Sequence, residues 1–326
     1  MINKLNQVIY LAKFAVKSRL NRSLRKPLLC SFKITGRCNL KCTHCPFWRD
    51  GSKNSSNFSG SLNSLNPQNI PIAPNSLSFE NIKEILQNLY SEGVRIVIFE
   101  GGEPLLWKDE KSAKDISDVI EYSKQLFFFT GVTTNGTIDI EWLDPDIFFI
   151  SIDGMQQTHD RLRGKSFARI MENIEKNRSH KKIIANICIS SENANEIEEL
   201  VRFLNSKVYG ITIQFFYPYD SVGDLKLGYE EKKNLLKNLI NLKSQGIKLL
   251  NSISCMKMMV NNTWKCDDFL VANVEKDGLV GRGCYLKNKT VKVSCDDCGF
   301  SVHCEISLAY RFNPDAIKTA VRIFWG

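Results

Sequence analysis

Three cysteines in the N-terminal part of the chain have a spacing that suits iron–sulfur chemistry. Cys38, Cys42 and Cys45 form the pattern C-x3-C-x2-C within a segment of eight residues. Three thiolates on one short loop can hold three irons of a 4Fe–4S cluster and leave the fourth iron open to another ligand. A structural zinc site is the alternative, but three cysteines without a fourth ligand nearby make a poor one.

Six strand-like segments, alternating with helix-like segments, must position these cysteines. The predicted strands are Leu28–Thr35, Arg95–Glu100, Leu126–Thr133, Ile147–Ile152, Ile183–Ser190 and Ile211–Tyr217. Apolar residues at helical spacing predict helices such as Phe79–Glu92, Ala168–Asn177 and Ala194–Leu204. Strands that alternate with helices predict parallel pairing with right-handed crossovers. Because six units are too few for a closed eight-fold barrel, we expect an α/β fold built as a partial (β/α)6 TIM-type barrel.

Polar and glycine residues follow the predicted strands at their carboxyl ends. Cys38 follows the first strand, Gly101-Gly102-Glu103-Pro104 the second, Thr134-Asn135-Gly136 the third and Ser151-Ile152-Asp153-Gly154 the fourth. In parallel α/β folds the reactive groups gather at these ends. The sequence therefore predicts that all four segments lie on one rim.

These motifs together resemble the radical SAM family, whose core is a partial barrel of this kind. The resemblance implies that Cys38, Cys42 and Cys45 hold a 4Fe–4S cluster whose open iron binds the amino and carboxylate groups of S-adenosylmethionine (SAM). In that family an electron from the cluster breaks the sulfonium. The products are methionine and a 5′-deoxyadenosyl radical, which takes a hydrogen atom from the substrate.

The resemblance also implies which side chains meet SAM. The expected SAM-binding residues are His44, Gly101, Gly102, Glu103, Pro104, Asn135, Ser151, Asp153 and Arg163. His44 stands where the family usually places an aromatic residue against adenine, Glu103 would accept from the ammonium group, and Arg163 would meet the carboxylate. Helix caps or surface ion pairs are the alternative for each residue. His159-Asp160 invites a catalytic-dyad interpretation, but we expect it to cap the following helix.

A second group of cysteines lies near the C-terminus. It comprises Cys266, Cys284, Cys295, Cys298 and Cys304. Asp277-Gly278 predicts a hairpin turn between the first two cysteines. The segment resembles the SPASM or shortened twitch domains of radical SAM enzymes, which implies one auxiliary 4Fe–4S cluster.

The resemblance assigns four ligands to this cluster: Cys266, Cys284, Cys295 and Cys298, with Cys304 as a substitute. A zinc ribbon is the alternative. The three remaining cysteines, Cys30, Cys188 and Cys255, are expected to be buried thiols.

Composition favours a soluble cytoplasmic protein. Of 326 residues 43% are hydrophobic and 24% charged, and the cysteines are clustered as for metal binding in a reducing compartment. Seven of the nine net positive charges lie in residues 1–26, so the remainder is not expected to bind nucleic acid. Residues 1–26 predict a basic helix with an apolar stripe of Ile2, Leu5, Val8/Ile9, Ala12, Ala15/Val16 and Leu20. Peripheral contact with an anionic membrane and packing across the barrel are the two interpretations.

The predicted organisation has four parts. They are the basic helix (1–26), the core (27–250), an auxiliary cluster domain (251–308) and a C-terminal helix (309–326). Residues 49–78 interrupt the core with a Ser/Asn/Pro/Gly-rich insertion, either neutral or a lid. The C-terminal helix has the same two interpretations as the N-terminal one.

The substrate is the open question, and three hypotheses about function remain. A lipid or other small molecule is slightly favoured by the basic helix. A ribosomally made peptide is the alternative, although peptide maturases often carry an N-terminal recognition domain and only residues 1–27 precede the first predicted strand. A non-enzymatic iron–sulfur or zinc protein is the third hypothesis. An enzyme would need an electron donor such as ferredoxin or flavodoxin.

The sulfatase-maturating members of the family resemble the chain over residues 30–304. They carry an aspartate directly after the cysteine that corresponds to Cys284, where this chain has Tyr285. That difference disfavours sulfatase maturation.

Overall fold

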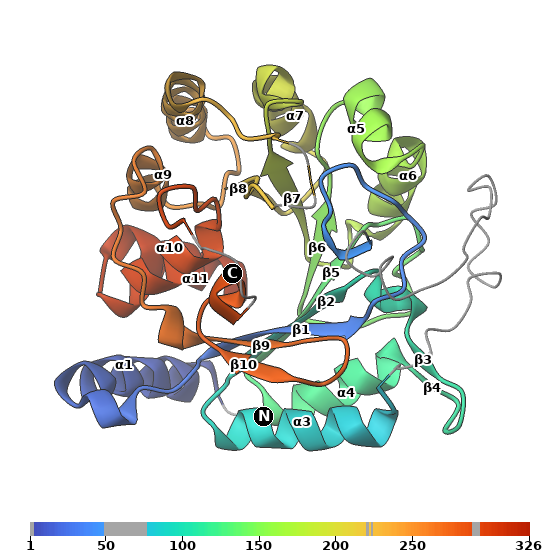
Figure 1. The fold of residues 1–326 in the computed structure, drawn as a ribbon, viewed down its shortest axis with the longest axis vertical. Coiled ribbons are helices and arrows are strands. Elements are labelled where there is room, and N and C mark those ends of the chain that lie inside the picture. Colours follow the sequence, from blue (N-terminus) through green and yellow to red (C-terminus); the bar gives the residue numbers. More distant parts are fainter. Residues whose placement is uncertain (1–2, 49–76, 220–221, 223, 289–293) are drawn as a thin grey trace.

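The computed structural model describes residues 3–48, 77–219, 222, 224–288 and 294–326. Within these residues an eight-stranded sheet has the order β10-β9-β1-β2-β5-β6-β7-β8, and only β10 is antiparallel to its neighbour. The strands curve around a centre with helices outside them (Figure 1). Because β10 and β8 are the two edges of this sheet, the barrel is open between them. The expectation of an α/β partial barrel is confirmed.

The elements have the following bounds. The strands are β1 (Leu29–Thr35), β2 (Ile96–Gly101), β3 (Lys108–Asp109), β4 (Lys114–Asp115), β5 (Phe129–Thr134), β6 (Ile147–Ser151), β7 (Ile183–Ile189), β8 (Gly210–Phe215), β9 (Val271–Val274) and β10 (Val280–Arg282). The helices are α1 (Lys4–Leu20), α3 (Phe79–Ser91), α4 (Ile116–Leu126), α5 (Gln156–Arg163), α6 (Phe167–Asn177), α7 (Ile197–Leu204), α8 (Tyr229–Ser244), α9 (Ile253–Met259), α10 (Ser301–Tyr310) and α11 (Pro314–Phe324). All six predicted strands are present, displaced by three residues at most.

The predicted hairpin around Gly278 is present as β9 and β10. Gly278 has φ +87°, a conformation that a turn of this kind requires and that glycine adopts without strain. The hairpin does not form a sheet of its own, because β9 pairs in parallel with β1. The segment that carries the second cysteine group is therefore continuous with the core sheet.

The two faces of the sheet differ in their exposure to solvent. Side chains that face the helices, such as Phe32 on β1 and Phe99 on β2, are fully buried. Residues that alternate with the helix-facing ones are partly exposed, among them Ser31 on β1 and Asn186 and Cys188 on β7. The inner face of the sheet is thus polar and partly exposed at such positions, whereas Leu29 and Ile96 on the same face belong to a buried apolar cluster.

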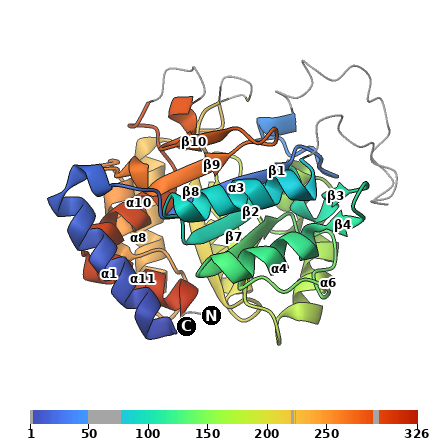
Figure 2. The same cartoon turned by 90° about the horizontal axis from the view of Figure 1, so that it is seen from below.

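Helix α1 contacts the rest of the molecule with a face that the sequence did not predict. Ser18 is fully buried and its hydroxyl lies 3.1 Å from the hydroxyl of Tyr310, while the ring of Tyr10 packs edge-on against Phe128 at 5.3 Å. Within the predicted apolar stripe, Leu5, Val8, Ile9, Val16 and Leu20 are exposed, while Ala15 is buried. Helix α1 packs against the body, which is one of the two interpretations, but its contact face is formed by Tyr10, Phe14, Ala15 and Ser18 and includes little of the predicted stripe. Figure 2 shows α1 beside α10 and α11.

Two further expectations concern segments next to these helices. The insertion at 49–78 lies outside the described residues except for Leu77 and Ser78, and Ser78 caps α3. Asn313 caps α11, with its side chain accepting from Asp315 N and Ala316 N. No helix among the described residues has the length and apolar character needed to cross a membrane.

Candidate functional site

The loop that carries the first three cysteines leaves β1 and is held by the residues that follow β2. Gly102 N donates to Thr35 O at 2.8 Å and Glu103 N donates to Arg37 O at 2.6 Å. A Cβ atom on Gly102 would lie 2.0 Å from Arg37 O, so only glycine allows this approach. The close backbone approach expected of the two glycines is therefore made to the cysteine loop itself.

The three thiols lie close together. Burial raises the pKa of Cys38 to about 12 and that of Cys42 to about 11, and nearby cysteines add to both shifts. Leu40 N donates to Cys38 Sγ at 3.4 Å, and the Asn135 amide lies 3.9 Å from the same sulfur. Such donors are suited to a thiolate that carries metal.

The donor set is the one expected for the cluster. Three sulfurs lie on one loop, and Leu40 N and the Asn135 amide lie beside one of them. A 4Fe–4S cluster takes thiolate ligands of this kind. Cys38, Cys42 and Cys45 are therefore the residues that would hold the 4Fe–4S cluster expected from the sequence.

Glu103 lies beneath the site, with no exposed surface. One carboxylate oxygen accepts from Thr134 Oγ1 at 2.7 Å and from Leu105 N at 3.2 Å, and the other accepts from Asn135 N at 2.7 Å. Burial raises the pKa of Glu103 to about 7. In this position the carboxylate holds the loop after β5, whereas the sequence suggested a direct contact with the SAM ammonium group.

Asn135 connects that loop to the cysteine loop. Its Nδ2 donates to Asn39 Oδ1 at 2.7 Å, while its Oδ1 accepts from Thr137 Oγ1 at 2.7 Å. Asn39 Nδ2 in turn donates to Thr137 Oγ1 at 2.8 Å. The Thr-Asn-Gly segment thus fixes the residue directly after Cys38.

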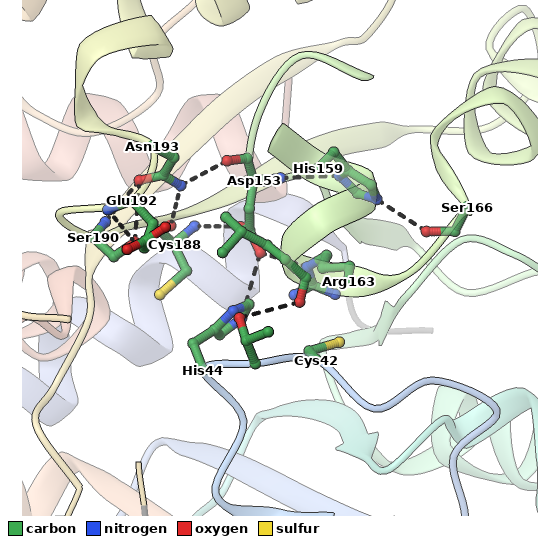
Figure 3. Close-up of polar contacts among 12 residues, drawn as sticks. Cys42, His44, Asp153, His159, Arg163, Ser166, Cys188, Ser190, Glu192 and Asn193 are labelled. Atoms are coloured by element: carbon green, nitrogen blue, oxygen red, sulfur yellow. Dashed lines mark hydrogen bonds and ion pairs between the residues drawn. The ribbon is translucent and has the colours of Figure 1, made fainter. Parts of the chain in front are cut away.

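Asp153, which follows β6, organises the opposite side of the site (Figure 3). Its carboxylate is fully buried, lies 3.4 Å from His44 Nε2 and accepts from Arg163 Nε and from Cys188 N, the last at 2.8 Å. Burial opposes ionisation, yet the Arg163 guanidinium and His44 lower the pKa of Asp153 below its usual range. The structure therefore places His44, Asp153 and Arg163 in one contact group, next to Cys42 and Cys188.

Ser151 and Arg163 each keep polar groups for a ligand. The Ser151 side chain forms no hydrogen bond with another described residue, although it ends β6 at this rim. Arg163 donates to Asp153 through Nε and keeps its other N–H groups. Cys42 lies close enough to raise the pKa of Arg163 further.

The predicted capping role of His159-Asp160 is confirmed for Asp160 alone. Asp160 Oδ1 accepts from Ser166 N and Phe167 N at 2.9 Å each, at the start of α6. His159 Nδ1 accepts from Asp153 N at 3.3 Å, and burial lowers the pKa of His159 to about 4. A neutral imidazole with both nitrogens engaged holds the segment together and is not a free base.

We expect the Arg163→Met variant to lose about 3–5 kcal/mol in the free energy of unfolding, because it leaves the Asp153 carboxylate buried without its partner cation. Arg161→Met on the same helix is the matched control. Its ion pair with Glu192 is about half exposed, with 52% and 38% of the two side chains accessible, so its loss should be below about 1 kcal/mol. Urea titration of both variants measures the difference, and equal losses would contradict the assignment.

Four cysteines of the second group are near enough for their charges to interact. Burial raises the pKa of Cys266 to about 12, and the charges of Asp268, Cys298 and Cys284 add to this shift. Burial also raises the pKa of Cys298 to about 11, with a further contribution from Cys284 and Cys295. These are the four expected ligands of the auxiliary cluster.

The two edges of the sheet supply three of these cysteines. Cys284 follows β10, one edge strand, after the turn at Gly283. The loop with Cys295 and Cys298 is fixed to β8, the other edge strand, because Phe215 N donates to Gly299 O at 3.0 Å. Cys266 instead precedes β9, in the segment between α9 and that strand.

Two cysteines differ from their predicted settings. Cys304 is fully buried in α10, where it interacts with Cys255 in the core, so it is separated from the other four and is not retained as a ligand. Cys188 is not a wholly buried thiol, because it lies on the partly exposed inner face beside Asp153. The packing of α10 keeps Cys304 away from the other four cysteines, and the alternation of side chains along β7 leaves Cys188 partly exposed.

Two residues that the sequence analysis did not assign lie near these cysteines. His303 Nδ1 is 3.9 Å from Cys266 Sγ, and its position directly before Cys304 was the available signal. The Tyr285 ring lies 4.0 Å from Lys33 Nζ and 6.1 Å from the Phe47 ring, two residues beyond Cys45. Tyr285 thus joins the segment with the second cysteine group to the first cysteine loop.

Comparison with known proteins agrees with this geometry. Residues 32–204 match the model of the Radical SAM superfamily. The sporulation killing factor maturation protein SkfB of Bacillus subtilis is 28% identical over 188 residues, which are 54% of this chain and 39% of SkfB. The AdoMet-dependent heme synthase of Methanosarcina barkeri is 28% identical over 203 residues, 57% of this chain and 50% of that enzyme. The matches thus span half or less of each relative.

A solved structure has the same fold over nearly the whole chain. Streptococcus suis SuiB bound to S-adenosylmethionine superposes with a TM-score of 0.63 at 15% sequence identity. The superposition covers 99% of this chain and 74% of SuiB.

Proposed function

The chain belongs to the radical SAM superfamily, and on that basis we propose that Cys38, Cys42 and Cys45 hold the cluster with which it cleaves SAM. Members of this superfamily are enzymes that use a 4Fe–4S cluster and SAM. The observation that carries the proposal is the cysteine loop itself. Its three sulfurs lie at the carboxyl end of β1 and are held by the residues that follow β2 and β5.

The chemistry follows from the bound groups and from the residues around them. The cluster, when bound and reduced by one electron from a donor such as ferredoxin or flavodoxin, supplies the electron that divides SAM into methionine and a 5′-deoxyadenosyl radical. Arg163 presents N–H groups to the SAM carboxylate, and Asp153 holds both Arg163 and His44 in place. The substrate gives one hydrogen atom to the radical, which leaves 5′-deoxyadenosine and a substrate radical.

The substrate binds on the inner face of the sheet in this proposal. That face carries polar, partly exposed residues such as Asn186 and Cys188, and Lys33 on β1 contacts the ring of Tyr285, which follows Cys284. An auxiliary 4Fe–4S cluster on Cys266, Cys284, Cys295 and Cys298 would accept or return an electron as the substrate radical forms product. Lys33 also pairs with Glu275 at 3.1 Å, so the hairpin and β1 are connected beside the substrate.

A ribosomally made peptide is the more specific candidate substrate. It is supported by the match to SkfB, a maturation protein, and by the fold shared with SuiB, which has also been solved with its precursor peptide SuiA. A lipid or another small molecule is the competing class.

The experiment is a comparison of peptides, lipids and metabolites between a deletion strain and its parent, followed by assay of the accumulated compound. The reduced protein should consume that compound together with SAM, forming one 5′-deoxyadenosine per substrate radical. If the substrate carries deuterium at the attacked carbon, deuterium should appear in 5′-deoxyadenosine. Unlabelled 5′-deoxyadenosine in that assay would contradict hydrogen abstraction from this substrate.

A further inference from the structure

The outer face of α1 is apolar, exposed and bordered by positive charge. Leu5 and Leu20 are 63% and 84% exposed, and three further apolar side chains between them, Val8, Ile9 and Val16, are 40–47% exposed. Residues 5, 9, 12, 16 and 20 recur at helical spacing, so these side chains form one stripe along the helix. A stripe of this kind on a protein surface marks a binding surface.

This stripe is not needed for the attachment of α1 to the body. The opposite face already packs there, through Tyr10 on Phe128 and Phe14 and Ser18 on Tyr310. At the N-terminal end of α1, Gln7 Oε1 accepts from Trp325 Nε1 at 3.0 Å. Helix α1 is thus fixed on one side and leaves a second apolar side facing water.

The charge around the stripe is of one sign. Residues 3–26 contain seven lysines and arginines and no acidic residue. Arg19 and Arg25 lie over the rings of Phe312 and Phe269, whereas Lys13 and Lys17 are exposed one turn apart beside the stripe. A second copy of this face would bring like charges together, so association of two such faces is disfavoured.

We propose that the outer face of α1 binds the surface of an anionic lipid bilayer. A helix of 17 residues is about 25 Å long, and lying in the plane of the bilayer it can bury the stripe among the acyl chains. Lysines at its borders then meet the lipid phosphates. A membrane surface matches both features of this face, because it combines an apolar interior that can bury the stripe with negatively charged headgroups that attract the lysines.

Sedimentation of the full-length protein with vesicles tests this proposal. Vesicles with about 30% phosphatidylglycerol in phosphatidylcholine should bind the protein, and pure phosphatidylcholine should bind it at least tenfold less. Salt at about 0.5 M should release part of it, because screening removes the lysine contribution. A variant with Leu5→Ser, Ile9→Ser and Val16→Ser should bind at least tenfold less, and Lys13→Glu with Lys17→Glu should behave similarly.

Matched controls change exposed residues elsewhere. Tyr229→Ser with Leu279→Ser removes apolar side chains that are 51% and 69% exposed, and Lys233→Glu with Lys237→Glu reverses two lysines one turn apart on α8. Both controls should bind as the wild type does. Undiminished binding of the α1 variants would overturn the proposal. It would also be overturned if the protein formed a dimer in the absence of vesicles and the α1 serine variant did not. Neither result depends on SAM cleavage, which is measured separately.

Discussion

The Cys42→Ala variant is expected to form no 5′-deoxyadenosine. Cys42 is one of only three sulfurs on the loop after β1, and with two ligands the cluster that binds SAM should not assemble. The wild-type protein, reconstituted anaerobically and reduced with dithionite, should release 5′-deoxyadenosine and methionine in equal amounts. Chromatography of the quenched reaction measures both products.

Cys30→Ala is the matched control for this experiment. Cys30 lies on β1, next to the site in sequence, but its thiol is fully buried in the hydrophobic core between the sheet and the helices. The variant loses one buried sulfur and should keep its SAM cleavage. If Cys42→Ala still turned over SAM, the assignment of the cluster to this loop would be wrong.

The triple variant Cys38→Ala, Cys42→Ala and Cys45→Ala should keep about half of the iron. Wild-type protein with two 4Fe–4S clusters holds about eight irons, and removing every ligand of the first cluster should leave about four. The remaining protein should be brown and keep the visible absorption of an iron–sulfur cluster. Iron and zinc analysis, together with the visible spectrum, measures this outcome.

Two further substitutions, each added to the triple variant, distinguish a cysteine that binds the auxiliary cluster from one that does not. Cys298→Ala should abolish the residual iron, because Cys298 lies next to Cys284 and Cys295. Cys304→Ala should leave it unchanged, because Cys304 interacts with Cys255 in the core. A colourless triple variant that contained zinc would show a structural ribbon, and the electron-transfer role would be lost with it.

Local sequence was sufficient to predict the barrel strands and the first cysteine loop. Strand β7 is recognisable from an apolar run, and Cys38, Cys42 and Cys45 lie within one loop, so their proximity needs no tertiary information. Gly278 could likewise be placed in a turn, because its conformation is decided by its immediate neighbours.

Tertiary structure decided which partners the individual side chains have. Glu103 appeared free to meet a ligand, but its two oxygens accept from Leu105 N, two residues away, and from Thr134 and Asn135, which come from another part of the chain. Cys304 follows Cys298 at a ligand-like spacing, yet the rotation of α10 turns its thiol into the core. Spacing along a chain limits which residues can meet, while the packing of helices and loops selects among them.

The same distinction applies to α1. Its sequence contains apolar residues on two sides, and periodicity alone could not tell which side the body covers. Contacts with Phe128, Tyr310 and Trp325 decide it, and these residues lie on segments far away in the chain. The sequence therefore determined that the helix is basic and carries apolar residues at helical spacing, whereas the tertiary structure determined which apolar face remains in water.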